Sequence, residues 1–244
     1  MNKDGIDVVV LAGGMATRMG PLCAWIPKAL LPILQTPFAV WQMRELTRSL
    51  SNLRRAFFVV RDGTESLFRE AAEQSPIPSY TFVEEMPKGT GGAILYAKEK
   101  AANLAMPLSD PFLVLNGDVL FEMRAENLIR KAQKFGVAIQ GISHDHAGSY
   151  GGLKMKDDRL IAFDEAQTGI INAGLYAFCH TTLDQCAGMS SFEAGMVPAL
   201  IKAGCCGVVM TEGAFIDIGT PANYALADSF IRRFAYEMQA RAKG

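Results

Sequence analysis

The sequence lacks the features that mark several large classes of protein. It has no surplus of one charge, because 24 Lys and Arg residues stand against 25 Asp and Glu residues, for a net charge of −1. Such a balance gives no general attraction to nucleic acid or to an anionic membrane. No stretch approaches the roughly 20 apolar residues of a membrane span, and the first residues have no apolar run typical of a signal peptide. We therefore expect a cytoplasmic protein that binds neither nucleic acid nor membranes.

Paired cysteines are also absent. The cysteines are five in number and contain no CxxC spacing, which disfavours both a disulfide framework and a zinc site. We expect five reduced thiols, at Cys23, Cys179, Cys186, Cys205 and Cys206. His144 and His146 lie close in sequence, but zinc sites need more ligands nearby, so we interpret both as loop residues.

Two common nucleotide-binding motifs are missing as well. The chain has neither the GxGxxG of dinucleotide-binding folds nor the GxxxxGK[ST] of the P-loop, which disfavours an oxidoreductase and an ATPase. It also lacks the DxD pair expected of a glycosyltransferase that consumes nucleotide sugars. Any nucleotide must therefore be bound by another kind of loop.

Short apolar runs alternate with amphipathic segments over the first two-thirds of the chain. This alternation predicts an α/β fold with a mainly parallel, doubly wound sheet, which binds ligands at the carboxyl ends of its strands. The predicted strands are 6–11, 56–60, 80–83 and 112–115, and the predicted helices are 37–50, 64–74 and 92–103.

From about residue 136 the strands follow one another closely, at 137–143, 152–155, 160–163 and 171–178. This spacing predicts an antiparallel extension, with a hairpin turn at 157–159. Two helices follow, over 191–203 and from Thr220 to about residue 241, and Ser190 and Glu193 have capping-box spacing before the first. Because no linker or repeat interrupts the chain, we expect one domain over 1–244 with two lobes, about 1–135 and about 136–244.

The most informative segment runs from Leu11 to Lys28, directly after the first predicted strand. Gly13 and Gly14 let backbone N–H groups approach phosphate oxygens without a Cβ in the way. Arg18 can bind two phosphate oxygens at once, and Lys28 adds a point charge. A plain turn between a strand and a helix is the alternative, but the two cations favour a triphosphate site.

The segment LAGGMATRMGPLCAWIPKALLPI resembles the signature of the nucleoside-diphosphate-sugar pyrophosphorylases, roughly GGxGTRLxPLTxxxPKPLLP. Four later segments resemble elements of that family in the same order, namely PKGTGGA (87–93), LNGD (115–118), INAGLY (171–176) and FIDIGTPANY (215–224). The pattern is most similar to the bacterial D-glycero-D-manno-heptose 1-phosphate guanylyltransferases. The resemblance implies a Rossmann-like doubly wound mixed sheet, of the GT-A-like nucleotidyltransferase kind, with an antiparallel sugar-binding extension in the second lobe.

The resemblance also implies a reaction and its site. An NTP and a sugar 1-phosphate would give a nucleotide sugar and pyrophosphate by direct attack on the α-phosphate, with Mg²⁺ as cofactor, and GTP with heptose 1-phosphate is the best-matching pair. It assigns catalysis to Arg18, Lys28 and Asp118, metal binding to Asp118 and Asp217, nucleotide binding to Leu11, Ala12, Gly13, Gly14, Gly89 and Thr90, and sugar-phosphate binding to Gly152, Glu165 and Asn172.

The chemistry of these residues fits the assignment but leaves alternatives. Carboxylate oxygens are natural Mg²⁺ ligands, yet only the fold can bring Asp118 and Asp217 together, and each could instead end a turn or a strand. The glycines at 89–92 could admit a flat base or simply begin a helix. Asn172 lies in an apolar strand and must find a polar partner, which could be a sugar hydroxyl or the protein itself.

Two departures from the family pattern bear on the prediction. The family commonly has lysine where this chain has Ala166, so Lys88 or Lys154 would have to meet the sugar phosphate, and Ala16 replaces the usual glycine before Thr-Arg. A UTP- or dTTP-dependent hexose-1-phosphate nucleotidyltransferase, or a regulatory homologue with impaired catalysis, therefore stay as alternatives. The apolar final helix also allows a homo-oligomer.

Overall fold

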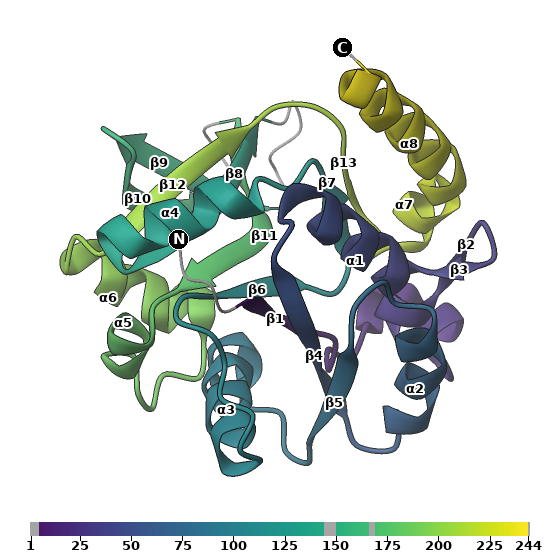
Figure 1. The fold of residues 1–244 in the computed structure, drawn as a ribbon, viewed down its shortest axis with the longest axis horizontal. Coiled ribbons are helices and arrows are strands. Elements are labelled where there is room, and N and C mark those ends of the chain that lie inside the picture. The colour runs from purple at the N-terminus through teal and green to yellow at the C-terminus, as the bar shows by residue number, and fades with distance from the viewer. Residues whose placement is uncertain (1–4, 144–149, 166–168, 244) are drawn as a thin grey trace.

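The computed structural model describes residues 5–143, 150–165 and 169–243 and is built around a nine-stranded mixed sheet (Figure 1). The strand order is β5–β4–β1–β6–β11–β8–β12–β10–β9. These strands are β1 Ile6–Leu11, β4 Leu53–Arg61, β5 Ser79–Glu84, β6 Phe112–Asn116, β8 Val137–Ser143, β9 Gly151–Lys156, β10 Arg159–Glu165, β11 Ile170–Phe178 and β12 Cys206–Thr211. Two small sheets pair β2 Pro32–Ile33 with β3 Thr36–Pro37 and β7 Val119–Phe121 with β13 Phe215–Asp217. The expected doubly wound mixed sheet is confirmed.

The direction of the strands changes along the sheet. Strands β5, β4, β1 and β6 are parallel, whereas β11 runs antiparallel to both of its neighbours, β6 and β8. The predicted antiparallel extension is confirmed, because β11 pairs antiparallel with β8 and β9, and β9 pairs antiparallel with β10. Strand β12, which was not part of that prediction, pairs in parallel with β8. A helical segment precedes β12 and carries the chain back across the sheet, so that it enters in the direction of β8.

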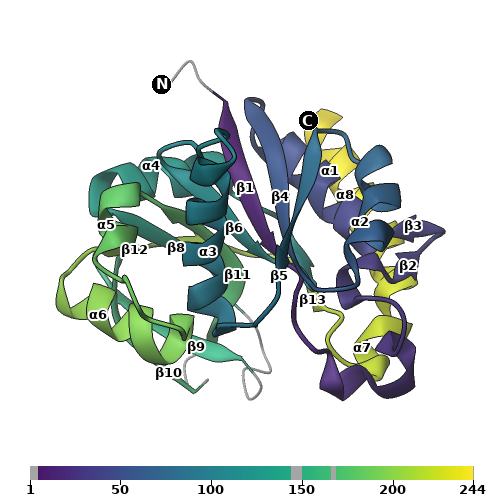
Figure 2. The ribbon, with the colours of Figure 1, turned by 90° about the horizontal axis from the view of Figure 1, so that it is seen from below.

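Helices cover both faces of the sheet (Figures 1 and 2). Val8 and Val10 of β1 share a core with α1, α2, α4 and α8, whereas Val9 shares the other core with α3, α5 and α6. Burial on both faces explains why β1 is an unbroken apolar run. The helices are α1 Phe38–Ser49, α2 Glu65–Glu73, α3 Gly89–Asn103, α4 Ala125–Phe135, α5 His180–Asp184, α6 Val197–Lys202, α7 Pro221–Ala225 and α8 Ala227–Lys243, with shorter turns η1 Thr17–Cys23, η2 Lys28–Leu30 and η3 Phe192–Met196.

The helix starts in the last third of the chain were predicted with mixed success. Thr220 caps α7 as expected, because its Oγ1 accepts a hydrogen bond from the Asn223 N–H at 3.2 Å. The prediction of one continuous final helix is wrong, since α7 and α8 are separate helices. The cap before η3 is Ser191, whose Oγ accepts from the Ala194 N–H at 3.0 Å, rather than the predicted Ser190.

Several smaller expectations can be checked directly. Asp157 and Asp158 both have left-handed backbones, with φ of 48° and 67°, as a two-residue hairpin turn requires between β9 and β10. All five cysteines are free thiols. Within the described residues, no helix has the length and apolar character needed to cross a bilayer. His144, His146 and Ala166 lie outside the described residues.

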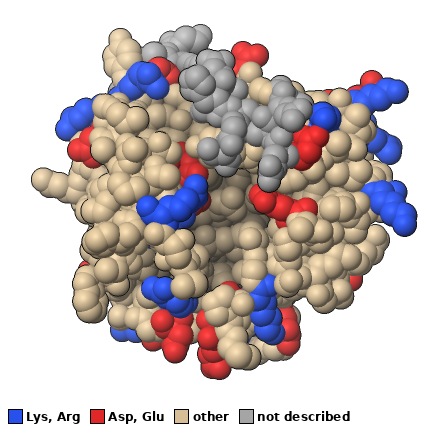
Figure 3. All heavy atoms as spheres, turned by 180° about the vertical axis from the view of Figure 1, so that it is seen from behind, with Lys and Arg blue, Asp and Glu red and all other residues tan. Residues whose placement is uncertain are grey.

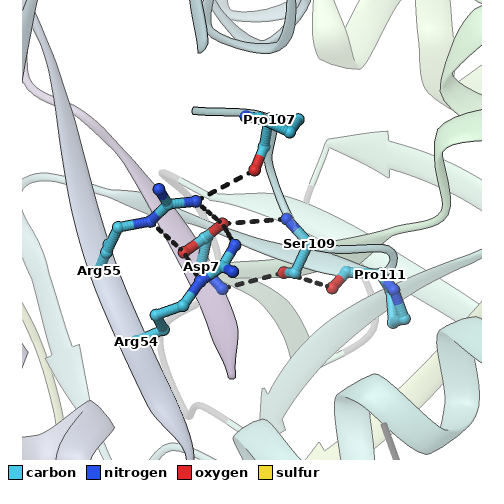
Figure 4. A network of polar contacts seen from close by, with 6 residues as sticks. All are labelled: Asp7, Arg54, Arg55, Pro107, Ser109 and Pro111. Carbon is cyan, nitrogen blue, oxygen red and sulfur yellow. Dashed lines mark hydrogen bonds and ion pairs between the residues drawn. The ribbon is translucent and has the colours of Figure 1, made fainter. Parts of the chain in front are cut away.

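A buried carboxylate anchors the amino end of β1 (Figure 4). Asp7 is fully buried, and its Oδ1 accepts hydrogen bonds from the Nε atoms of Arg54 and Arg55 at 2.9 and 3.0 Å. The Ser109 N–H donates to Oδ2 at 2.9 Å, and the Asp7 N–H donates to the Ser109 Oγ at the same distance. Burial acts to raise the pKa of Asp7, but the two arginines outweigh it and hold this pKa below its ordinary value. This network ties β1 and β4 together at the end of the sheet away from the predicted ligands.

Candidate active site

A cavity of about 330 Å³ opens at the carboxyl ends of β1, β4, β5 and β6. A volume of this order suits a small ligand. Its walls come from the loop after β1, the start of α3 and the turn after β6. The residues predicted to bind nucleotide all line it, and so do two of the three predicted catalytic residues: Leu11, Ala12, Gly13, Gly14, Gly89, Thr90, Lys28 and Asp118.

The turn that carries Asp118 is fixed against β1 by a glycine. The Gly117 N–H donates to the Leu11 carbonyl at 3.1 Å, which joins the ends of β6 and β1. A Cβ at this position would lie 2.8 Å from the same oxygen, so only glycine allows the approach. The close approach to β1 therefore explains why a glycine occupies the middle position of the asparagine-glycine-aspartate sequence at 116–118.

Gln42 of α1 also holds this turn in place. Its Nε2 donates to the carbonyls of Asn116 and Val119 at 2.8 and 2.7 Å, and the side chain is fully buried. Sequence reasoning missed this residue. The available signal was a glutamine next to Met43 and one turn before Leu46, on the face of the helix that the apolar residues mark as buried.

Helix α3 begins at Gly89, three residues before the predicted start at Gly92, so the glycines at 89–92 form its first turn. This agrees with the alternative that these glycines begin a helix. Gly89 has a φ of 76°, and a Cβ there would lie 2.7 Å from the Ser190 carbonyl oxygen. The Gly92 N–H donates to that oxygen at 3.0 Å. These glycines thus admit the neighbouring chain at residue 190, while Gly89 and Thr90 also border the cavity.

Asp118 and Asp217 converge through the small sheet of β7 and β13. Asp217 lies opposite Val119 in this pair, and the Ile218 N–H donates to the Asp118 carbonyl at 2.9 Å. Burial and the nearby Asp118 charge raise the pKa of Asp217 above its ordinary value, although the Gly219 N–H, Lys28 and Arg18 act against this rise. The fold therefore brings Asp118 and Asp217 together, which their spacing in the sequence could not establish.

The carboxylate pair fits a hard divalent cation. No group of three or more His, Cys, Asp or Glu side chains gathers within the described residues, so a cation here would take its other ligands from water or phosphate. Mg²⁺ commonly binds in that way, through one or two carboxylates. Asp217 is 9% exposed, and its Oδ1 accepts only the Gly219 N–H at 2.6 Å among the hydrogen bonds of the described residues.

Lys28 and Asp118 contact each other directly. The Lys28 Nζ lies 2.5 Å from the Asp118 Oδ2, and both side chains are mostly buried. Lys28 begins the short turn η2 directly after Pro27, and it lines the same cavity as Asp118. The residue predicted to meet phosphate thus already faces the predicted metal ligand.

Arg18 does not line the cavity of Gly13 and Lys28. It borders a second cavity of about 740 Å³ that lies between β13 and the helices α7 and α8, and Asp217 borders the same cavity. The predicted phosphate-binding group is therefore divided between two cavities that adjoin at the aspartate pair. Ala16, one of the departures from the family pattern, keeps a left-handed backbone with φ 52° and ψ 35°, a conformation that glycine adopts more easily.

The three predicted sugar-binding residues lie on neighbouring strands. Gly152 of β9 pairs with Asp164 of β10 and with Ile171 of β11, which brings it beside Asn172, and the backbone of Glu165 pairs one residue away. Gly152 and Asn172 line neither cavity.

The side chain of Asn172 finds its partners within the protein. Its Nδ2 donates to the Tyr176 hydroxyl at 2.8 Å and its Oδ1 accepts from the Gly174 N–H at 3.1 Å. These contacts favour the interpretation as a satisfied core asparagine. The two lysines considered for the sugar phosphate are also placed elsewhere, since Lys154 pairs with the exposed Asp164 at 2.7 Å and Lys88 borders neither cavity.

The surface opposite the view of Figure 1 is hollowed, and both basic and acidic side chains gather around the hollow (Figure 3).

A sequence profile for the family described as nucleotidyl transferase matches residues 7–233. The chain belongs to the nucleotidyl transferase family. This family member is 28% identical over 226 residues to a putative mannose-1-phosphate guanyltransferase of Sulfolobus acidocaldarius and 30% identical over 238 residues to the mannose-1-phosphate guanylyltransferase of Mycobacterium tuberculosis. Each match covers 90% of this chain but only 61% and 62% of the relative, so the chain spans less than two thirds of their length.

Solved structures give the same family member close neighbours in fold. HddC from Yersinia pseudotuberculosis superposes with a TM-score of 0.77 and 27% identity, covering 92% of this chain and 98% of that one. The same protein has also been solved in complex with GMP-PN, with a TM-score of 0.76. The inositol-1-phosphate CTP transferase from T. maritima, at 14% identity and a TM-score of 0.74, shares the fold.

Proposed function

We propose that this chain is a sugar-1-phosphate nucleotidyltransferase that makes a nucleotide sugar and pyrophosphate from an NTP and a sugar 1-phosphate. The observation that carries the proposal is the meeting of two cavities at one aspartate pair. The smaller cavity has glycine-rich walls and ends at Asp118, and the larger one ends at Asp217. Such an arrangement suits two substrates that must react with each other.

The proposed reaction is a single displacement at the α-phosphorus. A phosphate oxygen of the sugar 1-phosphate attacks the α-phosphorus, and the bond from that phosphorus to the oxygen bridging it to the β-phosphorus breaks. The bridging oxygen leaves with the pyrophosphate and carries the electron pair. No covalent bond to the protein is needed, so the protein's task is to align the reactants and to offset their charge.

The charges to be offset are large. Two unit like charges about 4 Å apart repel by roughly 4 kcal/mol at an effective dielectric constant near 20. Lys28 lies in the nucleotide cavity and Arg18 in the adjoining one, so each can meet a different part of the reacting phosphates. Asp118 and Asp217 are the residues that would hold Mg²⁺, which when bound supplies further positive charge to phosphate oxygens.

GTP and a sugar 1-phosphate of the mannose or heptose type are the proposed substrates. Two curated relatives are named as mannose-1-phosphate guanylyltransferases, or putatively so, and a solved neighbour is titled as a complex with GMP-PN. The heptose preference rests on the sequence resemblance. A UTP- or dTTP-dependent hexose-1-phosphate enzyme is the alternative within the same chemistry.

The test is a matrix of five NTPs against a panel of sugar 1-phosphates that includes mannose and heptose 1-phosphates, with release of pyrophosphate as the readout. We expect turnover with Mg²⁺ present and the fastest rates with GTP. If nucleotide binds in calorimetry while no pair releases pyrophosphate, the chain is a regulatory homologue and the proposal is wrong.

A matched pair of lysine variants tests the site itself. Lys28→Ala should lower turnover by about 100-fold or more, the usual loss when one charge-stabilising donor is removed. Lys131→Ala is the control, because Lys131 also pairs with an aspartate, Asp158, at 2.6 Å and has similar exposure, but lies away from both cavities. Equal turnover in the two variants would count against the assignment of Lys28.

A further inference from the structure

The larger cavity is lined by several polar and charged side chains to which the proposed reaction assigns no role. It lies between β13 and the helices α7 and α8, with Phe215 and Phe230 among its apolar walls. Hydroxyl and amide groups border it as well, from Thr220, Asn223 and Ser229. Its volume of about 740 Å³ is ample for a phosphorylated sugar.

Two guanidinium groups reach this cavity from different elements. Arg18 comes from η1 and Arg233 from α8, whereas Asp217 is the only carboxylate among the described lining residues. The cavity wall therefore has a surplus of positive charge. Planar guanidinium groups bind phosphate oxygens in pairs, so two of them facing one cavity favour a tetrahedral phosphate as the ligand.

Neither guanidinium is strongly engaged by the protein. Arg18 forms no hydrogen bond or ion pair with another described residue, and its Nη2 would lie 3.0 Å from a Cβ at Gly219, so it lies against this glycine. The Arg233 Nε lies 3.8 Å from the Glu237 Oε1, which is beyond hydrogen-bond range, and the Arg233 side chain is 64% exposed. Both side chains can turn to an incoming anion without breaking a strong contact.

The position of the cavity points to the sugar 1-phosphate rather than to the nucleotide. Tyr150 borders it and packs edge-on against Phe215, with ring centroids 5.5 Å apart. The next residue, Gly151, pairs with Glu165, so the cavity adjoins the strands predicted to bind the sugar. The nucleotide cavity has its own glycines and Lys28 on the other side of the aspartate pair. A direct displacement needs its two phosphates to approach from different sides, and two adjoining cavities meet that need.

We propose that Arg233, on the final helix, binds the phosphate group of the sugar 1-phosphate, together with Arg18, which lines the same cavity from η1. This inference rests on the proposed function and names the acceptor half of that site. The ligand class is a sugar phosphomonoester. The leaving pyrophosphate has the same kind of charge, and the experiment separates it from the acceptor.

The kinetic test compares neighbours on α8. Arg233→Ala should raise the KM for the sugar 1-phosphate about tenfold or more, the loss expected for a charge-assisted hydrogen bond, while the KM for GTP stays within about twofold. Arg232→Ala is the control, because Arg232 borders a separate hollow with Pro32 and Asp228 and should behave like the parent protein. Arg233→Lys should recover part of the loss.

Three kinetic outcomes would overturn the proposal. The first is equal behaviour of Arg233→Ala and Arg232→Ala. The second is an equal rise of both KM values in Arg233→Ala. The third is an unchanged KM for the sugar 1-phosphate together with weaker inhibition by pyrophosphate, which would assign Arg233 to the leaving group. Arg233→Lys keeps the comparison valid if the alanine variant fails to fold, because both readouts apply to it as well.

A binding measurement separates this proposal from the proposed function. Inorganic phosphate is titrated calorimetrically into the parent protein, Arg233→Ala and Arg232→Ala. Binding that only Arg233→Ala weakens, by about tenfold or more, supports the anion site even if no substrate pair turns over. No binding to the parent protein, or equal binding to both variants, overturns it even if the parent protein is an active enzyme.

Discussion

Replacing Asp7 by asparagine should lower the free energy of unfolding by about 2–4 kcal/mol at pH 7. Removing one partner of a buried ion pair usually costs about 3–5 kcal/mol, because the other partner keeps an uncompensated charge. Asp7 is fully buried, but Arg54 is 37% and Arg55 16% exposed, so water offsets part of the loss at the arginines. The asparagine amide would also present a donor where the carboxylate accepts from Arg54, Arg55 and Ser109.

The pH dependence of this difference has a defined sign. The folded-state pKa of Asp7 lies below the ordinary value of 3.8, so its contribution to stability is fully present above about pH 4 and is lost as the pH falls through the folded-state pKa. Urea unfolding of the parent protein and of Asp7→Asn, followed by circular dichroism at pH 7, 5 and 3.5, should therefore give a difference that is constant at first and then shrinks.

A surface carboxylate provides the control for this prediction. Asp158 also pairs with a cation, Lys131, but it is exposed, so Asp158→Asn should stay close to the parent protein. Because Asp7 lies at the amino end of β1 and the cavity proposed to bind the nucleotide lies at its carboxyl end, the KM for GTP should not change in Asp7→Asn. Equal stability of the two variants at pH 7, or a difference that grows on acidification, would refute the reasoning.

Three further substitutions test how the site is supported. Gln42→Leu leaves two buried carbonyls of the Asp118 turn without a donor and should cost about 2–4 kcal/mol in urea unfolding and reduce pyrophosphate release; unchanged unfolding would contradict it. Ala16→Gly removes a left-handed alanine and should raise the unfolding free energy by up to about 1 kcal/mol, and a lower melting temperature would be the wrong sign. Gly89→Ala combines a φ of 76° with a Cβ only 2.7 Å from the Ser190 oxygen and should cost about 1–2 kcal/mol and raise the KM for GTP, whereas normal values of both would show that the turn can adjust.

The sequence predicted those elements whose cause is local. The bounds of β1 and β8 agree with the predicted strands at both ends, because each is a mostly apolar run that begins directly after a glycine. Helix α4 was not predicted, although Leu128, Ala132 and Phe135 have the spacing of a buried helical face. The parallel direction of β12 could not be predicted in the same way, since it depends on where the preceding helical segment lies in space.

The residues of the candidate site can likewise be divided into those that local sequence predicts and those that depend on the fold. The glycines after β1 could be predicted because their role follows from their place at a strand end, and they do line a cavity there. The placement of Arg18 and Lys28 in different cavities could not be predicted, because nine residues with a kink at Gly20 lie between them. The helical spacing could have marked Gln42 as a buried polar residue, but not its role in the site, since its two acceptors lie in a turn far along the sequence.

The pairing of β7 with β13 has a consequence for how the protein is made. Chains grow from the amino end, and the strands β1, β4, β5 and β6, which carry the glycine-lined cavity, leave the ribosome well before β13. Until β13 has been synthesised, Asp118 has no second aspartate beside it. The glycine-rich walls of the smaller cavity therefore come from the first half of the chain, whereas the aspartate pair proposed to hold Mg²⁺ is completed only when the last part has been made.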